Sequence, residues 1–183
     1  MKPIKTILIM SMLLTCSCGM GGSVDNTTVA KLDLDRYLGT WYEIARYDHS
    51  FERGIEYSTA KYTLNEDGSV KVTNSGMKNG KYKESVGKAF RPDPQGEPAR
   101  LRVSFFGPFY SDYRVLMITD NYQYALVGSK SSKYLWILSR TPYACEETLK
   151  AILDEASRRG YDTSKLHWVR QGTKFECTYE HWE

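Results

Sequence analysis

Gly39-Thr40-Trp41-Tyr42-Glu43-Ile44-Ala45-Arg46 begins a long series of short segments rich in Tyr, Val, Ile and Thr. Such residues favour β-strands, and turn sequences such as Asn65-Glu66-Asp67-Gly68 and Lys78-Asn79-Gly80 separate consecutive segments. The predicted strands cover residues 39–48, 56–65, 69–77, 82–91, 100–106, 110–119, 122–129 and 133–140. Eight strands at this spacing predict an antiparallel up-and-down meander that closes into a barrel, because closure removes exposed strand edges.

One helix is predicted after these strands. Its apolar residues recur at helical spacing and form a single stripe: Leu149, Ile152, Leu153 and Ala156. Acidic residues stand in its first turn, and the sequence Arg158-Arg159-Gly160 marks its end. A single stripe packs on one surface, so the expected fold is all-β with one C-terminal α-helix outside the barrel. A last short strand over Leu166–Arg170 is expected to complete it.

The composition limits the class of protein. The chain has 183 residues, which is enough for one domain with a substantial core. Hydrophobic residues make up 41%, which excludes intrinsic disorder, and a mean hydropathy of −0.51 excludes a polytopic membrane protein. A formal charge of +3 is too small for a dedicated nucleic-acid-binding protein. The 14 Tyr and four Trp favour strands and an apolar ligand pocket.

The N-terminus resembles a bacterial lipoprotein signal. Residues 1–17 are basic, then apolar, then small, which is typical of a secretory signal too short to span a membrane. The apolar run stops at two cysteines, and we expect Cys18 to be acylated, for example with palmitate, and to become the mature N-terminus. Cys16 is the alternative, and an ordinary secreted protein that discards both cysteines is another.

The expected domain organisation follows from this signal. Residues 18–32 form the lipidated N-terminus and a flexible tether, residues 33–171 the barrel domain, and residues 172–183 a C-terminal tail.

Three motifs resemble those of the lipocalins. Gly39 and Trp41 match the Gly-x-Trp opening, Thr119 and Asp120 match the second motif, and a segment ending in Arg140 matches the third. Nearly the whole mature chain is similar to the bacterial outer-membrane lipoprotein lipocalins, and to apolipoprotein D among animal members. The resemblance implies an eight-stranded barrel with an outer helix, in which Trp41 plugs one end and Arg140 packs over its ring. These motif residues are therefore expected to be structural.

Alternation along the strands, phased by these motifs, assigns one set of residues to the barrel interior. Small residues on several strands leave volume, while aromatic and aliphatic residues provide walls for one ligand. The predicted ligand-binding residues are Tyr62, Asn74, Phe105, Arg114, Leu116, Trp136 and Leu138. Asn74 also matches the position at which, by the resemblance, apolipoprotein D offers an asparagine to its ligand.

Arg114 gives the most specific prediction about the chemistry of the ligand. A cation inside an apolar cavity requires an anion, and a fatty-acid carboxylate or a lipid phosphate suits it. Two alternatives remain: an internal pair with Asp112 or Glu43, or a one-residue change of phase that turns Arg114 to solvent. Glu43 and Ala45 are also assigned to the interior, with Glu43 as a hydrogen-bonded structural carboxylate.

The resulting expectation is a lipid-anchored protein of the bacterial outer membrane, facing the periplasm, that stores or transports a fatty acid or lysophospholipid. The alternatives are a carrier of another hydrophobic ligand, such as haem or a pigment, and a lipid-modifying enzyme. No catalytic residues are predicted, because Ser58-Thr59-Ala60-Lys61 lacks the motifs that accompany it in enzymes. His49, His167 and His181 are widely spaced, so no metal site or other cofactor is predicted. The sequence leaves open whether two barrels pair as a homodimer.

Cys145 and Cys177 have a separate expected role. An oxidising compartment permits a disulfide between them, which closes a loop of about 30 residues and contributes about 3 kcal/mol. Two free thiols are the alternative.

Overall fold

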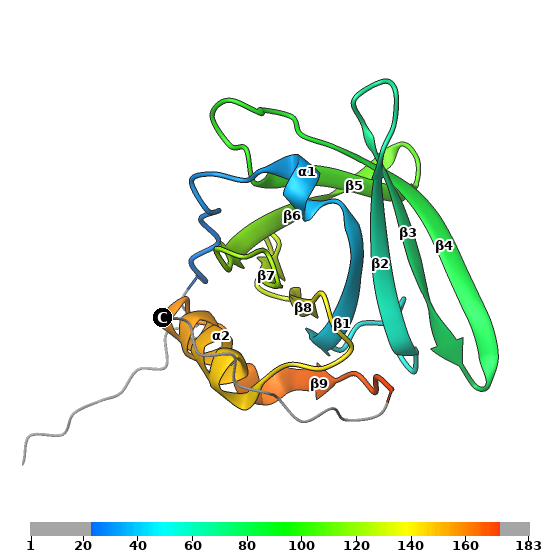
Figure 1. The fold of residues 1–183 in the computed structure, drawn as a ribbon, viewed down its shortest axis with the longest axis vertical. Coiled ribbons are helices and arrows are strands. Elements are labelled where there is room, and N and C mark those ends of the chain that lie inside the picture. Colours follow the sequence, from blue (N-terminus) through cyan, green and yellow to red (C-terminus); the bar gives the residue numbers. More distant parts are fainter. Residues whose placement is uncertain (1–22, 173–183) are drawn as a thin grey trace, which may run out of the picture.

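The protein is a closed antiparallel β-barrel with one helix on its outside (Figure 1). The structure, a computed structural model, describes residues 23–172. The strands are β1 Gly39–Tyr47, β2 Glu56–Leu64, β3 Val70–Lys78, β4 Lys81–Phe90, β5 Arg100–Phe106, β6 Phe109–Ile118, β7 Tyr124–Gly128, β8 Leu135–Ser139 and β9 Leu166–Trp168. The helices are α1 Leu34–Tyr37, α2 Glu146–Arg158 and the 3-10 helix η1 Thr163–Lys165.

Consecutive strands pair as a meander, and β1 pairs with both β8 and β2 to close the barrel. All eight predicted barrel strands are confirmed. β7 and β8 each begin two residues later than predicted, and β9 ends at Trp168 rather than Arg170. The hairpin between β3 and β4 turns through Asn79 (φ 52°) and Gly80 (φ 71°), the left-handed pair that this tight turn requires.

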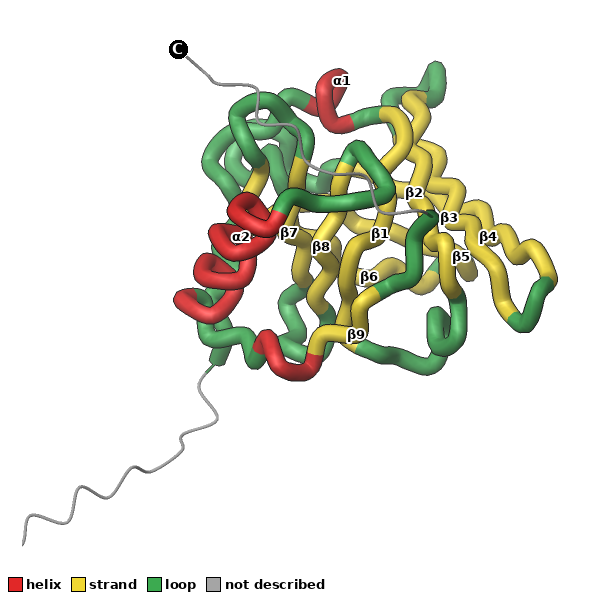
Figure 2. The backbone as a smooth tube through the Cα atoms, turned by 60° about the horizontal axis from the view of Figure 1, so that its bottom comes forward, coloured by secondary structure: helices red, strands yellow, loops and turns green. Residues whose placement is uncertain are grey.

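The two ends of the barrel differ in their connections. We call the mouth the end formed by residues 48–55, 78–81, 106–109 and 129–134, which join the strands in pairs from β1 to β8. The opposite, plugged end carries the other three connections and α1. Figure 2 shows α1 at one end of the barrel and β9 near the other.

Helix α2 covers one side of the barrel wall. Its residues Ile152 and Ala156 are buried against the outer face of β6, β7 and β8. The acidic residues Glu146 and Glu147 in its first turn interact favourably with the positive end of the helix dipole. The outside position predicted from the apolar stripe is therefore confirmed. None of the helices within residues 23–172 is long and apolar enough to cross a membrane.

A β-bulge in β1 changes which residues face inward. The pairing of β1 with β8 shifts register between Glu43 and Ala45. As a result Ala45 packs in the cluster under α2, and Arg46 is fully buried and bonded to the interior carboxylate of Glu43. The inward assignment of Ala45 is wrong, because the extra residue reverses the alternation beyond Glu43.

The phase of β6 also differs from the prediction. Tyr113 and Val115 belong to the interior cluster, whereas Leu116 packs in the cluster with α2. Arg114 consequently points to the outer face, and a register shift follows between Val115 and Met117. The assignment of Arg114 and Leu116 to the ligand-facing interior is wrong.

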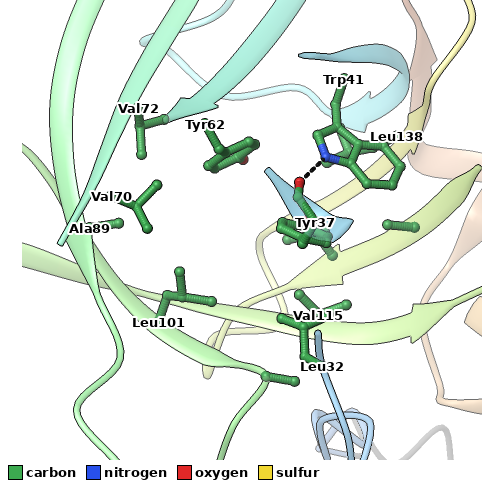
Figure 3. Close-up of a cluster of buried hydrophobic side chains, with 13 residues drawn as sticks. Leu32, Tyr37, Trp41, Tyr62, Val70, Val72, Ala89, Leu101, Val115 and Leu138 are labelled. Carbon is green, nitrogen blue, oxygen red and sulfur yellow. Dashed lines mark hydrogen bonds between the residues drawn. The ribbon is translucent and has the colours of Figure 1, made fainter. Parts of the chain in front are cut away.

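The plugged end holds the interior hydrophobic core. Tyr37 and Trp41 are fully buried, and Trp41 Nε1 donates to the carbonyl oxygen of Tyr37 over 2.8 Å (Figure 3). Tyr62, on β2, packs 5.6 Å from the Tyr37 ring, centroid to centroid. Aliphatic residues from β3, β5 and β6 complete the cluster: Val70, Val72, Leu101 and Val115. Helix α1, which the strand pattern does not predict, thus inserts a tyrosine into the barrel floor.

Candidate functional site

The motif residues form the seal of the plugged end. The Arg140 guanidinium lies 3.8 Å from the centroid of the Trp41 ring. It also donates to the carbonyl oxygens of Arg36, Thr40 and Tyr122, over 2.6 to 3.3 Å. The predicted structural role of Trp41 and Arg140 is confirmed, since these contacts bind α1, β1 and the β6–β7 turn together.

The second motif has a local role. Thr119 Oγ1 accepts from the backbone N–H groups of Gln123 and Tyr124. Asp120 is exposed, and its carbonyl oxygen accepts from the guanidinium of Arg36. Both residues therefore fix a turn at the plugged end.

Above this floor, the interior wall is apolar and comes from several strands. Leu138 is buried in the interior cluster, and Phe105 and Trp136 pack against it. Gly87 allows the Phe105 ring to approach, because a Cβ atom at Gly87 would lie 2.9 Å from Phe105 Cδ1. The hydroxyl groups of Tyr62 and Tyr113 form a hydrogen bond across the barrel, with their oxygen atoms 2.9 Å apart. The inward positions predicted for Tyr62, Phe105, Trp136 and Leu138 are confirmed.

A buried ionic cluster lies nearer the mouth. Arg46 donates to Glu43 Oε1 over 2.9 Å and to the carbonyl oxygens of Glu52 and Ile55 over the same distance. The second carboxylate oxygen of Glu43 accepts from Ser58 Oγ over 2.8 Å. The structural role predicted for Glu43 is therefore confirmed, and its partner is Arg46. Arg46 thus holds the 48–55 loop onto the barrel.

Glu52 adds a second carboxyl group to this cluster. Its Oε2 accepts from Trp136 Nε1 over 3.1 Å and lies 3.9 Å from Arg46 Nε. Burial, with a smaller contribution from the neighbouring charge of Glu43, raises the pKa of Glu52 to about 8. Burial also raises the pKa of Glu43, while the adjacent Arg46 guanidinium opposes that rise. The Arg46 guanidinium therefore lies beside two carboxyl groups, those of Glu43 and Glu52. Because its pKa is about 8, Glu52 is mostly protonated at neutral pH.

Aromatic side chains cap the ionic cluster at the mouth. The rings of Tyr134 and Trp136 stack at 5.9 Å, and the His49 ring stacks on Phe51 at 4.1 Å. His49 is also 5.2 Å from the Trp136 ring. Burial lowers the pKa of His49 to about 4, with Arg46 contributing, so the imidazole is neutral at pH 7.

Several buried polar atoms of the interior lack a hydrogen-bond partner among the residues that the structure describes. They are Arg46 Nε, both ring nitrogens of His49 and Asn74 Oδ1. Buried polar atoms are normally satisfied, so such a group indicates where a polar part of a ligand or a water molecule can bind. Asn74, predicted as a ligand contact, therefore retains an acceptor for this purpose.

Arg114 is instead paired on the outside of the barrel. Its Nε donates to Asp112 Oδ2 over 2.6 Å, and Nη1 lies 3.6 Å from Glu97 Oε1. Nη1 also donates to the carbonyl oxygen of Asn26. The Asp112 pair that the sequence left open is present, but it faces away from the interior.

The cation inside the barrel is Arg46, not Arg114. Neither Arg46 nor Glu52 could be found by alternation, because one follows a bulge and the other lies in a loop. The available signal was the charge content of the β1–β2 segment, in which Arg46, Asp48 and Glu52 occur within seven residues.

Two surface cavities lie beside the barrel wall. One, of about 660 Å³, is bounded by mouth residues such as His49 and Tyr134 and by Val24 and Tyr161 near the end of α2. The other, of about 370 Å³, is bounded by residues 26–30 and Arg114. Across residues 23–172, no group of His, Cys, Asp or Glu is arranged to hold a metal ion.

Cys145 immediately precedes α2 and is disulfide-bonded. Its predicted partner, Cys177, lies outside the described residues, as do the predicted signal peptide and acylated Cys18. The pairing of Cys145 with Cys177 stays a prediction.

Residues 32–171 match the model of the lipocalin-like domain. The chain belongs to the lipocalin family. It is 49% identical over 149 residues to the outer membrane lipoprotein Blc of Escherichia coli strain K12, covering 79% of this chain and 82% of that protein. Bovine apolipoprotein D is 34% identical over 142 residues, covering 73% and 74% of the two chains.

Among solved structures, this lipocalin is similar to insecticyanin from the tobacco hornworm Manduca sexta. The TM-score is 0.68 at 24% identity, with 81% of this chain and 85% of that chain covered. This likeness confirms the barrel fold. The family assignment agrees with the prediction of a binding protein rather than an enzyme. The name of the Escherichia coli relative agrees with the predicted outer-membrane localisation.

Proposed function

We propose that this lipocalin binds a single-chain amphipathic lipid, a fatty acid or a lysophospholipid, inside the barrel and stores or carries it at the cell envelope. The observation that carries the proposal is the division of the interior into two levels. An apolar floor and wall around Tyr62, Leu138 and Phe105 lie below a buried polar cluster around Arg46 and Glu52. We expect the acyl chain to pack against the first level and an oxygen-bearing head group to hydrogen-bond at the second.

The chemistry of the polar level favours a head group with both donors and acceptors. Arg46 Nε can donate to a ligand oxygen, whereas Asn74 Oδ1 can only accept from a ligand. A fatty-acid carboxylate supplies acceptors alone, while a lysophospholipid supplies phosphate oxygens and a glycerol hydroxyl. Among the two lipids, we therefore expect the lysophospholipid to bind more tightly.

A displacement assay tests this ligand class. The purified lipocalin is loaded with a fluorescent fatty acid, and lysophosphatidylethanolamine, palmitate and haem compete in turn. Displacement by both lipids at micromolar concentration, with lysophosphatidylethanolamine the stronger, supports the proposal. Displacement by haem alone would contradict it.

Burying an acyl chain contributes about 0.8 kcal/mol per methylene group before the costs of association. A chain of about twelve carbons can therefore reach micromolar affinity. Shortening the competing fatty acid should weaken its binding steadily, and an affinity independent of chain length would refute an acyl-chain site.

We also infer that Cys18 is acylated and tethers the barrel to the outer membrane, with the domain in the periplasm. The support is the cysteine that follows the apolar run and the outer membrane lipoprotein named among its relatives. Incorporation of labelled palmitate should be lost in Cys18→Ser and kept in Cys16→Ser. The reverse result would move the anchor to Cys16.

A further inference from the structure

We propose that the barrel docks on a phospholipid bilayer through its mouth, so that the mouth connections contact the membrane surface. The inference rests on the acylated Cys18 of the proposed function. Its structural basis is the path of the N-terminal segment, the length of the tether, and the character of the two barrel ends.

Residues 23–33, which we call the strap, run beside β6 from the mouth to the plugged end, where Leu32 packs in the interior cluster. Near the mouth, Asn26 Nδ2 donates to the carbonyl oxygen of Lys130 over 3.1 Å. Farther along, Val29 N donates to the carbonyl oxygen of Val115. At the plugged end, Asp33 N donates to the Tyr122 hydroxyl over 2.9 Å.

The start of the strap is fixed at the mouth by the end of α2. Asp25 N donates to the carbonyl oxygen of Arg159 over 2.8 Å. The buried Arg159 guanidinium in turn donates to the carbonyl oxygens of Thr27 and Leu116, over 2.8 Å each. Val24 and the mouth residues His49 and Tyr134 line one cavity, so the tether leaves the domain beside the mouth.

The tether is too short to place the plugged end on the membrane. Four residues lie between Cys18 and Ser23, the start of the strap, and the five Cα-to-Cα steps between them span about 18 Å at most. A ten-residue strand such as β6 is about 33 Å long, and a barrel strand tilt of about 40° gives a barrel height of about 25 Å. With the plugged end on the bilayer, the start of the strap would stand farther from the surface than the tether reaches.

The two ends also differ in charge. The four mouth connections, residues 48–55, 78–81, 106–109 and 129–134, carry five basic and two acidic residues. The three connections of the plugged end, residues 65–69, 91–99 and 119–123, carry one basic and five acidic residues. Phospholipid surfaces that contain anionic lipids attract the first set and repel the second.

Exposed phenylalanines supply the apolar part of the mouth surface. Phe106 and Phe109 are 80% and 78% exposed, and Phe51 is 60% exposed. Large aromatic side chains in such positions are costly in water and partition into the interfacial region of a bilayer. The mouth therefore combines aromatic and basic groups, which is the composition of a membrane-contacting surface.

Hydrogen–deuterium exchange of the full mature lipoprotein tests this orientation. The protein is compared in detergent-free solution and in vesicles of phosphatidylethanolamine with a minority of phosphatidylglycerol. Docking through the mouth should slow exchange by about tenfold in residues 48–55, 106–109 and 129–134, and leave residues 65–69 and 119–123 unchanged. Protection of the plugged-end connections, or no difference between the two ends, would overturn the proposal.

A matched pair of variants identifies the contact. Phe106→Ser/Phe109→Ser removes two exposed mouth side chains, and Leu64→Ser/Phe90→Ser removes two exposed ones near the plugged end, 46% and 38% exposed. The mouth variant should lose most of the protection, and the control should keep it. Equal loss in both variants would refute a specific mouth contact.

Fatty-acid displacement without vesicles separates this proposal from the ligand proposal. The mouth variant should keep its affinity in that assay, because Phe106 and Phe109 point to solvent. A protein that fails to bind any lipid but shows mouth protection would refute the proposed ligand and leave the docking intact.

Discussion

Replacing Glu52 with glutamine should change how the stability of the protein depends on pH. The pKa of Glu52 is raised to about 8 by burial, and its side chain is only 12% exposed. Glutamine removes the titrating group but retains a carbonyl oxygen that can accept from Trp136 Nε1. The substitution therefore isolates the electrostatic cost of the carboxylate from its hydrogen bond.

The sign follows from the direction of the pKa shift. The folded protein holds the Glu52 proton more tightly than the unfolded chain, whose pKa is 4.5. Stability is therefore lost as pH rises from about 4.5 to about 8. One pKa unit corresponds to about 1.4 kcal/mol, which sets a ceiling of about 5 kcal/mol. Water that reaches the 12% exposed side chain reduces this ceiling, and we expect about 2 kcal/mol.

His49 acts in the opposite direction over part of this range. Its pKa falls from 6.5 to about 4 on folding, so stability is lost as pH falls through that interval. The two effects oppose each other below pH 6.5. The wild-type protein should therefore lose stability mainly between about pH 6.5 and 8, and the Glu52→Gln variant should not.

Urea unfolding followed by tryptophan fluorescence at about pH 5, 6.5 and 8 measures the effect. The stability of Glu52→Gln relative to wild type should rise by about 2 kcal/mol between the lowest and the highest pH. Glu84→Gln is the control, because Glu84 is exposed on β4. A Glu52→Gln difference that is the same at all three pH values would refute the electrostatic argument.

Three further predictions concern the interior wall, the buried ion pair and the disulfide. Trp136→Ala should weaken binding of the fluorescent fatty acid about tenfold, since it removes an interior wall; Trp168→Ala, on the outer strand β9, should not, and equal effects would refute the pocket. Arg46→Met should destabilise the protein by about 3–5 kcal/mol because it leaves the buried Glu43 carboxylate unpaired. Arg114→Met should cost about 1 kcal/mol, and the reverse order in urea unfolding would contradict the placement of these residues. Cys145→Ser should cost about 3 kcal/mol, and an unchanged midpoint would show that the disulfide does not constrain the unfolded chain.

The strands and the outer helix could be predicted because their signals are local. Turn residues such as Asn79 and Gly80 fix the limits of a hairpin, and one apolar stripe fixes the buried side of α2. The plug of Trp41 under Arg140 followed from the family motif, since both residues serve the fold rather than one ligand.

The inward or outward direction of several side chains could not be predicted. Alternation identifies a buried face only where the other face is polar, and α2 makes both faces of β6 apolar around Val115 and Leu116. The β1 bulge reversed the phase near Ala45, so that Arg46 faces inward where an outward residue was expected. Bulges depend on how two distant strands pair, and the sequence of one strand does not reveal them.

The seam between β1 and β2 has a consequence for export. Beyond Tyr42, β1 leaves β2 and pairs with β9, while the Gln171 side chain donates to the carbonyl oxygens of Glu43 and Ser58 across the gap. The first strand of the barrel is thus completed by nearly the last described residue. In a chain that crosses a membrane from its N-terminus onward, β1 can gain all its partners only after residues 166–171 have emerged. We therefore expect β1, although it is the first strand of the barrel, to be the last to gain all its partners during export.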